Sequence, residues 1–187
     1  MANSIFIHPQ AIVESETIGA GTRVWAFAHV MKDARIGMGC NIGDHAFVES
    51  GVTIGNDVTI KNGVSVWDGV EIGDLVFVGP NVAFTNDFRP RSKVYHSEVD
   101  RTMILEGASI GANATILPKL TIGKYAMIGA GAVVTKSVRD YELVHGNPAR
   151  HAGWVSRTGE KLLFEDAKAS CEGVNYVLRP DGIVEIG

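Results

Sequence analysis

A repeat of six residues runs through most of this chain and limits what it can fold into. Counting in steps of six from Ile12 gives an unbroken series to Phe84, and the series resumes from Ile104 to Val134. Eighteen of these 19 positions hold Ile or Val, although these two residues make up only about one in five of the chain. A period of six matches neither a helix nor a strand with alternating sides. The repeat therefore predicts a chain that turns a corner every six residues.

Two further columns of residues follow the same period. Gly comes directly after the repeated Ile or Val at nine positions, and a small or apolar residue such as Ala28, Cys40 or Val58 stands four places on. These columns predict short strands that point one β-branched and one small side chain inward, with glycine at corners where φ can be positive. Three such strands close a triangular coil of about 18 residues, and coils stack through parallel ladders. We therefore expect an all-β fold, a parallel β-helix solenoid of about six coils.

The composition fits one such domain and excludes several other classes. The 187 residues carry a formal net charge of −4, with 45% hydrophobic and 20% charged side chains, which argues against a nucleic-acid binder and against disorder. The chain lacks an apolar run of the roughly 18–20 residues needed to cross a bilayer, and MANSIFIHPQ is not typical of a signal peptide. Two cysteines do not make a disulfide framework. We expect a cytoplasmic protein that binds neither nucleic acid nor a membrane.

The repeat is interrupted once, between Phe84 and Ile104. Compared with one hexapeptide, this interval holds 14 extra residues, and the insertion lies in TNDFRPRSKVYHSEVDR, residues 85–101. It contains four Lys or Arg and three Asp or Glu side chains together with Pro90, and it lacks the period of the solenoid. A long loop that leaves a regular scaffold usually has a function. We expect the insertion to border a site.

The period also indicates what lies at the base of this loop. Residues 18 apart lie on adjacent coils, so Asn86 stacks on Asp68, and Thr85 stacks on Trp67, which stacks on Glu49. A carboxylate, an amide and an indole at corner positions add little to a core. They indicate either a solvent-exposed corner with a surface tryptophan or a substrate site in which Asp68 and Asn86 face a ligand.

Several motifs resemble a known enzyme family over residues 5–155. The hexapeptides resemble acyltransferases that use acetyl-CoA or acyl carrier protein, and the more specific motifs are similar to those of enzymes that N-acetylate 3-amino sugars attached to nucleotides. These motifs are VSVWDG (64–69), VFVGPNVAFTND (76–87), PRSK (90–93), GASIGANATILP (107–118), IGAGAVVTKSV (128–138) and VHGNPAR (144–150). The resemblance implies a left-handed β-helix and a homotrimer with active sites between subunits.

Two subfamilies compete within this resemblance. One acetylates dTDP-3-amino-3,6-dideoxyhexoses for cell-surface polysaccharides, and the other acetylates the 3-amino group of UDP-2-acetamido-3-amino-2,3-dideoxyglucuronate. WDG followed by FTND and PRSK is more similar to the dTDP type. A uronate needs a cation near C6, which Arg89 or Arg91 can supply. A non-catalytic solenoid scaffold is a further alternative, although a scaffold has no need for the insertion.

The implied reaction requires a neutral amine that attacks the thioester of acetyl-CoA and then loses a proton. Asp68 and Asn86 are placed to orient the amine, and the resemblance adds Asp87 and implies that the CoA thiolate takes the final proton. His96 is the rival base, since many hexapeptide O-acetyltransferases use a histidine. The expected substrate-binding residues are Trp67, Glu49, Arg89, Arg91, Lys93 and His96.

The co-substrate acetyl-CoA is expected along the late coils. Backbone N–H groups there can meet its pantetheine amides, and Lys136 or Arg150 can meet a phosphate. The candidates for the pantetheine are Gly111, Ala112, Gly129 and Ala130. No metal is expected, because three converging histidines would be needed, and His29 and His45 are 16 residues apart and do not stack.

The six-residue period stops after VHGNPAR. We expect a β-helix domain over residues 1–148 and a small extension over residues 149–187. Two segments of the extension, GWVSRTGEKLLF and CEGVNYVLRPDGIVEI, have the pattern of short strands, with Pro180–Asp181–Gly182 as a tight turn. The extension is therefore predicted to form an antiparallel cap over the open end of the solenoid.

Overall fold

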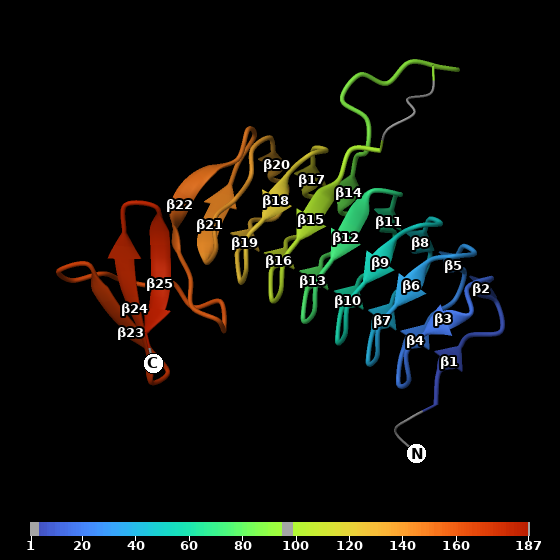
Figure 1. The fold of residues 1–187 in the computed structure, drawn as a ribbon, viewed down its shortest axis with the longest axis horizontal. Helices are drawn as coiled ribbons and strands as arrows, with labels where there is room; N and C mark the ends of the chain where they lie inside the picture. The colour runs from blue at the N-terminus through green and yellow to red at the C-terminus, as the bar shows by residue number, and fades with distance from the viewer. Residues whose placement is uncertain (1–3, 95–98, 187) are drawn as a thin grey trace.

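The computed structural model of the chain describes residues 4–94 and 99–186, and in these ranges every regular element is a β-strand. Most strands are two residues long and are joined by tight turns. They stack into a long solenoid, with a small sheet of longer strands at its C-terminal end (Figure 1). The predicted all-β parallel solenoid is confirmed.

Three sheets form the faces of the solenoid, and we name them A, B and C. In the described ranges, sheet A has nine strands, sheet B seven and sheet C six. Sheet A consists of β1 (Phe6–Ile7), β4 (Arg23–Val24), β7 (Asn41–Ile42), β10 (Thr59–Ile60), β13 (Phe77–Val78), β16 (Ser109–Ile110), β19 (Met127–Ile128), β21 (Glu142–His145) and β22 (Arg150–Trp154). Sheet B consists of β2 (Ile12–Val13), β5 (His29–Val30), β8 (Phe47–Val48), β11 (Ser65–Val66), β14 (Ala83–Phe84), β17 (Thr115–Ile116) and β20 (Val133–Val134). Sheet C consists of β3 (Thr17–Ile18), β6 (Arg35–Ile36), β9 (Thr53–Ile54), β12 (Val70–Ile72), β15 (Thr102–Ile104) and β18 (Thr121–Ile122).

Strand register turns the repeat into a core. Ile60 on β10 lies opposite Ile42 on β7 and Val78 on β13, so the inward side chains of successive coils stack in a column. All three residues are fully buried, as are most of the repeated Ile and Val residues. A continuous hydrophobic core therefore runs through the coils.

The first coil departs from the predicted count. Ile12 lies opposite His29 and is 58% exposed, whereas Val13 lies opposite Val30 and packs against the core. The inward column therefore passes through Val13 and reaches Ile18 five residues later. The prediction that Ile12 belongs to this column is wrong, because the hexapeptide that follows is one residue short.

The glycines that follow the inward column are needed for a different reason from the one expected. A Cβ on Gly37 would overlap the carbonyl group of Gly55 on the next coil, and the φ of Gly37 is not positive. Positive φ occurs two places further on, at Gly39 (φ 68°) and at Asp57 (φ 54°). Close stacking of backbones therefore requires glycine directly after the inward residue, as at Gly37. The left-handed conformation occurs two residues later, as at Gly39.

The chain changes sheets at edges that we name A–B, B–C and C–A, and the insertion lies on the B–C edge. It leaves the solenoid after β14, where residues 85–94 project as a loop, and residues 99–101 lead back along the solenoid into β15 (Figure 1). Its return is attached to two coils, because the Thr102 N–H donates to Gly69 O at 2.8 Å and Lys119 forms an ion pair of 2.8 Å with Asp100. The base of the loop is thus fixed to the scaffold.

The C-terminal extension forms the predicted antiparallel cap. β22 runs antiparallel to β21, and a separate antiparallel sheet consists of β23 (Lys168–Cys171), β24 (Val174–Arg179) and β25 (Gly182–Ile186). The ring of Tyr141, at the end of the solenoid, packs on Tyr176 with centroids 5.7 Å apart, and its hydroxyl donates to Glu185 at 2.9 Å. A second hydrophobic core therefore joins the cap to the last coil.

Candidate active site

Successive coils place side chains in one column along the B–C edge. The register of β11, β14, β17 and β20 puts Asp68, Asn86, Pro118 and Lys136 at equivalent positions, two residues past each strand. The register thus agrees with the predicted stacking of Asn86 on Asp68. Neighbouring strands lie about 4.8 Å apart, so three coils separate the Lys136 and Asp68 positions by roughly 14 Å along the axis. We call this set the B–C column.

The carboxylate of Asp68 is held on one side and open on the other. Its Oδ1 accepts the N–H of Gly69 at 2.8 Å, and the Asp68 N–H donates to Glu49 Oε2 at 2.8 Å. Gly51, with φ 85°, makes room for the carboxylate, since a Cβ on it would lie 2.7 Å from Oδ1. Within residues 4–94 and 99–186, no hydrogen bond or ion pair reaches Oδ2. This oxygen is therefore available to a ligand.

Trp67 and Glu49 lie beside Asp68 and also have structural contacts. The Trp67 ring packs on Phe47 with centroids 5.4 Å apart and joins the hydrophobic core. Glu49 is half-buried, and one of its carboxylate oxygens accepts the hydrogen bond from the Asp68 N–H. Both side chains therefore support the position of Asp68.

Asn86 and Asp87 begin the loop, one coil after Asp68. Thr85 anchors this point, because its N–H and its hydroxyl both donate to the last carbonyl of β17, at 3.1 and 3.0 Å. Asp87 Oδ1 accepts the backbone N–H of Arg89 at 2.7 Å, which closes a turn. Asn86 itself is exposed, so its amide can reach a ligand.

The predicted basic ligands of the loop lie on the surface. Arg89, Arg91 and Lys93 are exposed, and Arg91 donates to the carbonyl of Pro90 at 2.9 Å. His96 lies outside the described residues, so the structure does not place it. The roles of these side chains in substrate binding stay predictions.

A cavity of about 520 Å³ opens beside Asp68, at the returning end of the loop. Arg101 and Glu71 form an ion pair of 3.2 Å in its lining. The stacking rule does not place Val99 or Arg101, because the count of 18 fails across the insertion, whereas Glu71 keeps the count and lies opposite Thr53. The lining consists of Gly51, Asp68, Gly69, Val70, Glu71, Val99 and Arg101.

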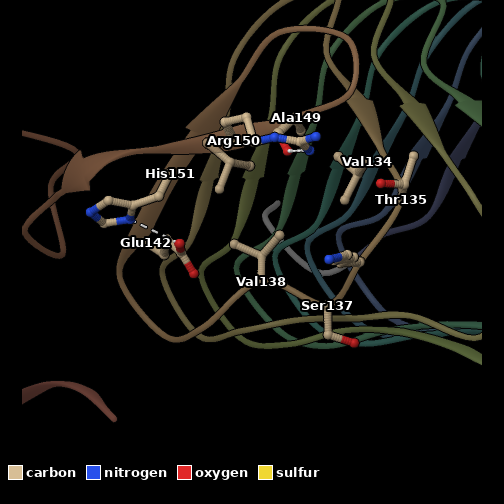
Figure 2. Close-up of a pocket in the computed structure, with 10 residues that line it drawn as sticks. Val134, Thr135, Ser137, Val138, Glu142, Ala149, Arg150 and His151 are labelled. Atoms are coloured by element: carbon tan, nitrogen blue, oxygen red, sulfur yellow. Dashed lines mark hydrogen bonds and ion pairs between the residues drawn. The ribbon is translucent and has the colours of Figure 1, made fainter. Parts of the chain in front are cut away.

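A second cavity, of about 330 Å³, lies at the C-terminal end of the B–C edge (Figure 2). Lys136 lines it from the turn after β20, and Arg150 lines it from β22. Two residues predicted to bind CoA thus share one cavity. Their positive charges suit phosphate groups, which cationic side chains bind through charge-assisted hydrogen bonds.

Glu142 lines the same cavity with a side chain that is only 9% exposed. Its Oε2 accepts the backbone N–H and the Nε–H of Arg139 at 2.9 and 3.1 Å, and its Oε1 lies 2.9 Å from His151 Nδ1 (Figure 2). Burial acts to raise the pKa of Glu142, but the hydrogen bonds from Arg139 and His151 outweigh it, and the pKa lies below its usual value. The carboxylate is therefore charged at neutral pH.

The other predicted CoA residues lie on a different edge. Gly111, Ala112, Gly129 and Ala130 follow β16 and β19 on the A–B edge. Gly111 and Gly129 donate their N–H groups to the next coil at 2.8 Å, whereas in the described part of the chain the N–H groups of Ala112 and Ala130 have no backbone partner. A single protomer therefore does not bring these residues together with Lys136.

The described residues contain no group of three or more His, Cys, Asp or Glu side chains placed to hold a metal ion. None of the elements formed by residues 4–94 and 99–186 is a helix long and apolar enough to cross a membrane.

Sequence relatives identify the family. The family described as "Bacterial transferase hexapeptide (six repeats)" matches residues 17–50, 51–86 and 101–136. The chain is 52% identical to a dTDP-3-amino-3,6-dideoxy-alpha-D-galactopyranose 3-N-acetyltransferase from Aneurinibacillus thermoaerophilus, over 183 residues that cover 98% of this chain and 95% of that protein.

Solved structures share the solenoid. A hexapeptide-repeat acetyltransferase from Vibrio cholerae O1 biovar eltor, crystallised with acetyl coenzyme A, matches with a TM-score of 0.56 at 26% identity, over 63% of this chain and 68% of that chain. AntD, an N-acyltransferase from Bacillus cereus whose variant was crystallised with dTDP and coenzyme A, shares the fold with a TM-score of 0.51 at 20% identity, over 82% and 83% of the two chains. The solenoid is the left-handed parallel β-helix of hexapeptide transferases. The chain belongs to the hexapeptide-repeat acyltransferases and, within them, to the nucleotide-sugar 3-N-acetyltransferase family.

Proposed function

We propose that this protein is an acetyl-CoA-dependent N-acetyltransferase that acts on the 3-amino group of a dTDP-3-amino-3,6-dideoxyhexose. The 52% identity to a dTDP-3-amino-3,6-dideoxygalactose 3-N-acetyltransferase, over 98% of the chain, carries this proposal. It favours a dTDP-linked deoxyhexose over the UDP-linked uronate, and an enzyme over a non-catalytic scaffold. The open Oδ2 of Asp68 beside a cavity supports the same function, since an amine substrate needs an anionic or accepting partner.

Asp68 and Asn86 orient the amino group in this proposal. A sugar amine is partly protonated at neutral pH, and Asp68 Oδ2 holds the ammonium group and accepts its proton before the attack. The Asn86 amide, one coil later, hydrogen-bonds to the same nitrogen. The neutral amine then attacks the carbonyl carbon of the acetyl thioester, the C–S bond breaks, and the proton released from nitrogen leaves with the CoA thiolate.

Acetyl-CoA lies along the B–C edge and supplies the activated acetyl group. Lys136 and Arg150 hold its phosphates in the cavity of about 330 Å³. The roughly 14 Å between the Lys136 and Asp68 positions is a span that the long pantetheine arm can cover. The thioester thus reaches the amine at Asp68.

A homotrimer completes the site. Ala112 and Ala130 present N–H groups on the A–B edge, whereas Asp68 and Lys136 lie on the B–C edge. Cyclic packing of three prisms sets the A–B edge of one subunit beside the B–C edge of the next, so one pantetheine meets both edges. Each of the three interfaces then forms one substrate cleft, because a flat prism face needs a second wall.

Release of free thiol from acetyl-CoA tests the proposed function. We expect turnover with dTDP-3-amino-3,6-dideoxygalactose and none with the same nucleotide sugar carrying a 3-hydroxyl group. A higher kcat/KM for the UDP-linked 3-amino uronate would reverse the choice of subfamily. No turnover with any 3-amino nucleotide sugar would refute the proposal that the protein is this enzyme.

A further inference from the structure

The returning end of the loop builds one wall of the cavity beside Asp68. A Cβ on Gly69 would overlap Val99 Cγ1, so Val99 rests directly on the glycine that follows Asp68. Arg101, two residues later, is tied to Glu71 of β12 by the ion pair of 3.2 Å. Val99 and Arg101 therefore lie against the solenoid surface.

Apart from Asp68, the described residues that line this cavity have no net charge and no unpaired cation. Asp68 and Glu71 contribute two carboxylates, and Arg101 contributes one guanidinium group that is already paired with Glu71. An anionic group that entered the cavity would lose water without gaining a free cation, which is unfavourable. The other described residues of the lining are uncharged: Gly51, Gly69, Val70 and Val99.

The lack of a free cation decides how a nucleotide-linked amino sugar can lie once its amine is at Asp68, since the ammonium group then neutralises Asp68. From C3, the pyranose ring runs one way to C2 and C1, which bears the diphosphate, and the other way to C4, C5 and C6. The described lining offers the diphosphate no free cation and accepts a neutral C4–C6 part. The sugar therefore turns C5 and C6 towards Glu71 and Val99.

We propose that Val99 and the Glu71–Arg101 pair form the C6 subsite of the enzyme and select a 6-deoxy sugar, an assignment that rests on the proposed function. Val99, 47% exposed, offers an apolar contact to the C6 methyl group. A C6 hydroxyl would lose water against Val99, and a C6 carboxylate would find no unpaired cation among the described lining residues. Glu71 also occupies Arg101, the one Lys or Arg among the described lining residues, which a uronate would otherwise use.

Ratios of kcat/KM for dTDP-linked sugars that differ only at C6 test this subsite. The probes are dTDP-3-amino-3,6-dideoxy-D-galactose, its 6-hydroxy analogue and the corresponding uronate. We expect the wild-type enzyme to prefer the 6-deoxy sugar about tenfold over the 6-hydroxy analogue and about a hundredfold over the uronate. In Val99→Thr, the preference for the 6-deoxy sugar over the 6-hydroxy analogue should fall to about threefold or less. In Glu71→Gln, the preference for the 6-deoxy sugar over the uronate should fall about tenfold.

These ratios do not depend on how much of each variant is folded, since a loss of active protein lowers both kcat/KM values alike. Val94→Thr is the matched control, because Val94 is an exposed valine of the same loop and does not line the cavity. Unchanged ratios in both Val99→Thr and Glu71→Gln would overturn the C6 subsite and leave the proposed function intact. A wild-type enzyme that turns over no 3-amino nucleotide sugar would refute the proposed function, and this subsite with it.

Discussion

The carboxylate of Glu49 accepts a hydrogen bond of 2.8 Å from the backbone N–H of Asp68 on the next coil. One carboxylate oxygen of Asp68 in turn accepts the Gly69 N–H, and the other remains available to a ligand. We infer that Glu49 acts through Asp68, because it fixes the backbone from which the proposed reactive carboxylate projects. A hydrogen bond that involves a charged group contributes about 1.5–3 kcal/mol, so its loss would allow this corner to shift.

Glu49→Ala removes the acceptor for the Asp68 N–H. We expect kcat to fall about 10- to 100-fold with little change in KM for acetyl-CoA, because a misplaced group costs turnover rather than co-substrate binding. Glu49→Gln keeps an acceptor oxygen and should retain activity within about threefold. Steady-state thiol release from both variants and the wild type measures the difference. Equal losses in the two variants would show that Glu49 does not act through this hydrogen bond.

Asp68→Asn should lower kcat about 10²- to 10⁴-fold, the usual contribution of a positioned acid–base group. The new amide oxygen still accepts the Gly69 N–H, so the melting temperature should stay close to that of the wild type. Asn86→Ala should also lower kcat, and His96→Ala should leave it near the wild-type value. If His96→Ala alone abolished turnover and Asp68→Asn did not, the loop histidine would be the base and our assignment would be wrong.

Lys136→Ala and Arg150→Ala should each raise KM for acetyl-CoA about tenfold and leave kcat nearly unchanged, since each removes a cation that meets a phosphate. The rise should shrink with increasing ionic strength, because salt screens exposed charges. Lys32 is the matched control, as it is exposed and holds the equivalent position of the B–C column on an early coil. A similar KM increase in Lys32→Ala would indicate an effect of total charge rather than of this cavity.

Glu142 should make the last coil sensitive to acid. Its pKa in the folded protein is lower than its ordinary value, so its stabilisation is complete above the ordinary pKa of about 4.3 and is lost as the pH falls through the folded-state pKa. Glu142→Gln should reduce the free energy of unfolding by about 1–3 kcal/mol at neutral pH and by little in strong acid. Urea unfolding of both proteins from pH 7 to pH 2 measures this, and a pH-independent difference would contradict it.

The hexapeptide count predicts the scaffold because every coil repeats it. It places Asp68 and Asn86 in one column, and the register of β11 with β14 agrees. The count fails where a coil changes length, as at Ile12, which faces outward because the hexapeptide after it is a residue short. The count also does not show which residues before the insertion lie beside residues at its end, so the ion pair of Arg101 with Glu71 could not be predicted.

Backbone donors set a second limit on sequence-based prediction. The motifs identify Gly111 and Gly129 as candidates for the CoA site, but the solenoid ladder already uses their N–H groups. A repeat shows which residues turn a corner, and only the folded register shows which donors remain after the ladder forms. For the same reason, the contact of Glu49 with the Asp68 backbone has no signature in the sequence.

A structure of the protein with CoA and dTDP-3-amino-3,6-dideoxygalactose bound is the most direct test of the central claim. We predict that the sugar N3 atom lies about 3 Å from Asp68 Oδ2 and within reach of the Asn86 amide. The CoA phosphates should lie against Lys136 and Arg150, with the pantetheine arm along the B–C edge. A complex in which the sugar amine lies out of hydrogen-bonding reach of both Asp68 and Asn86 would contradict this account.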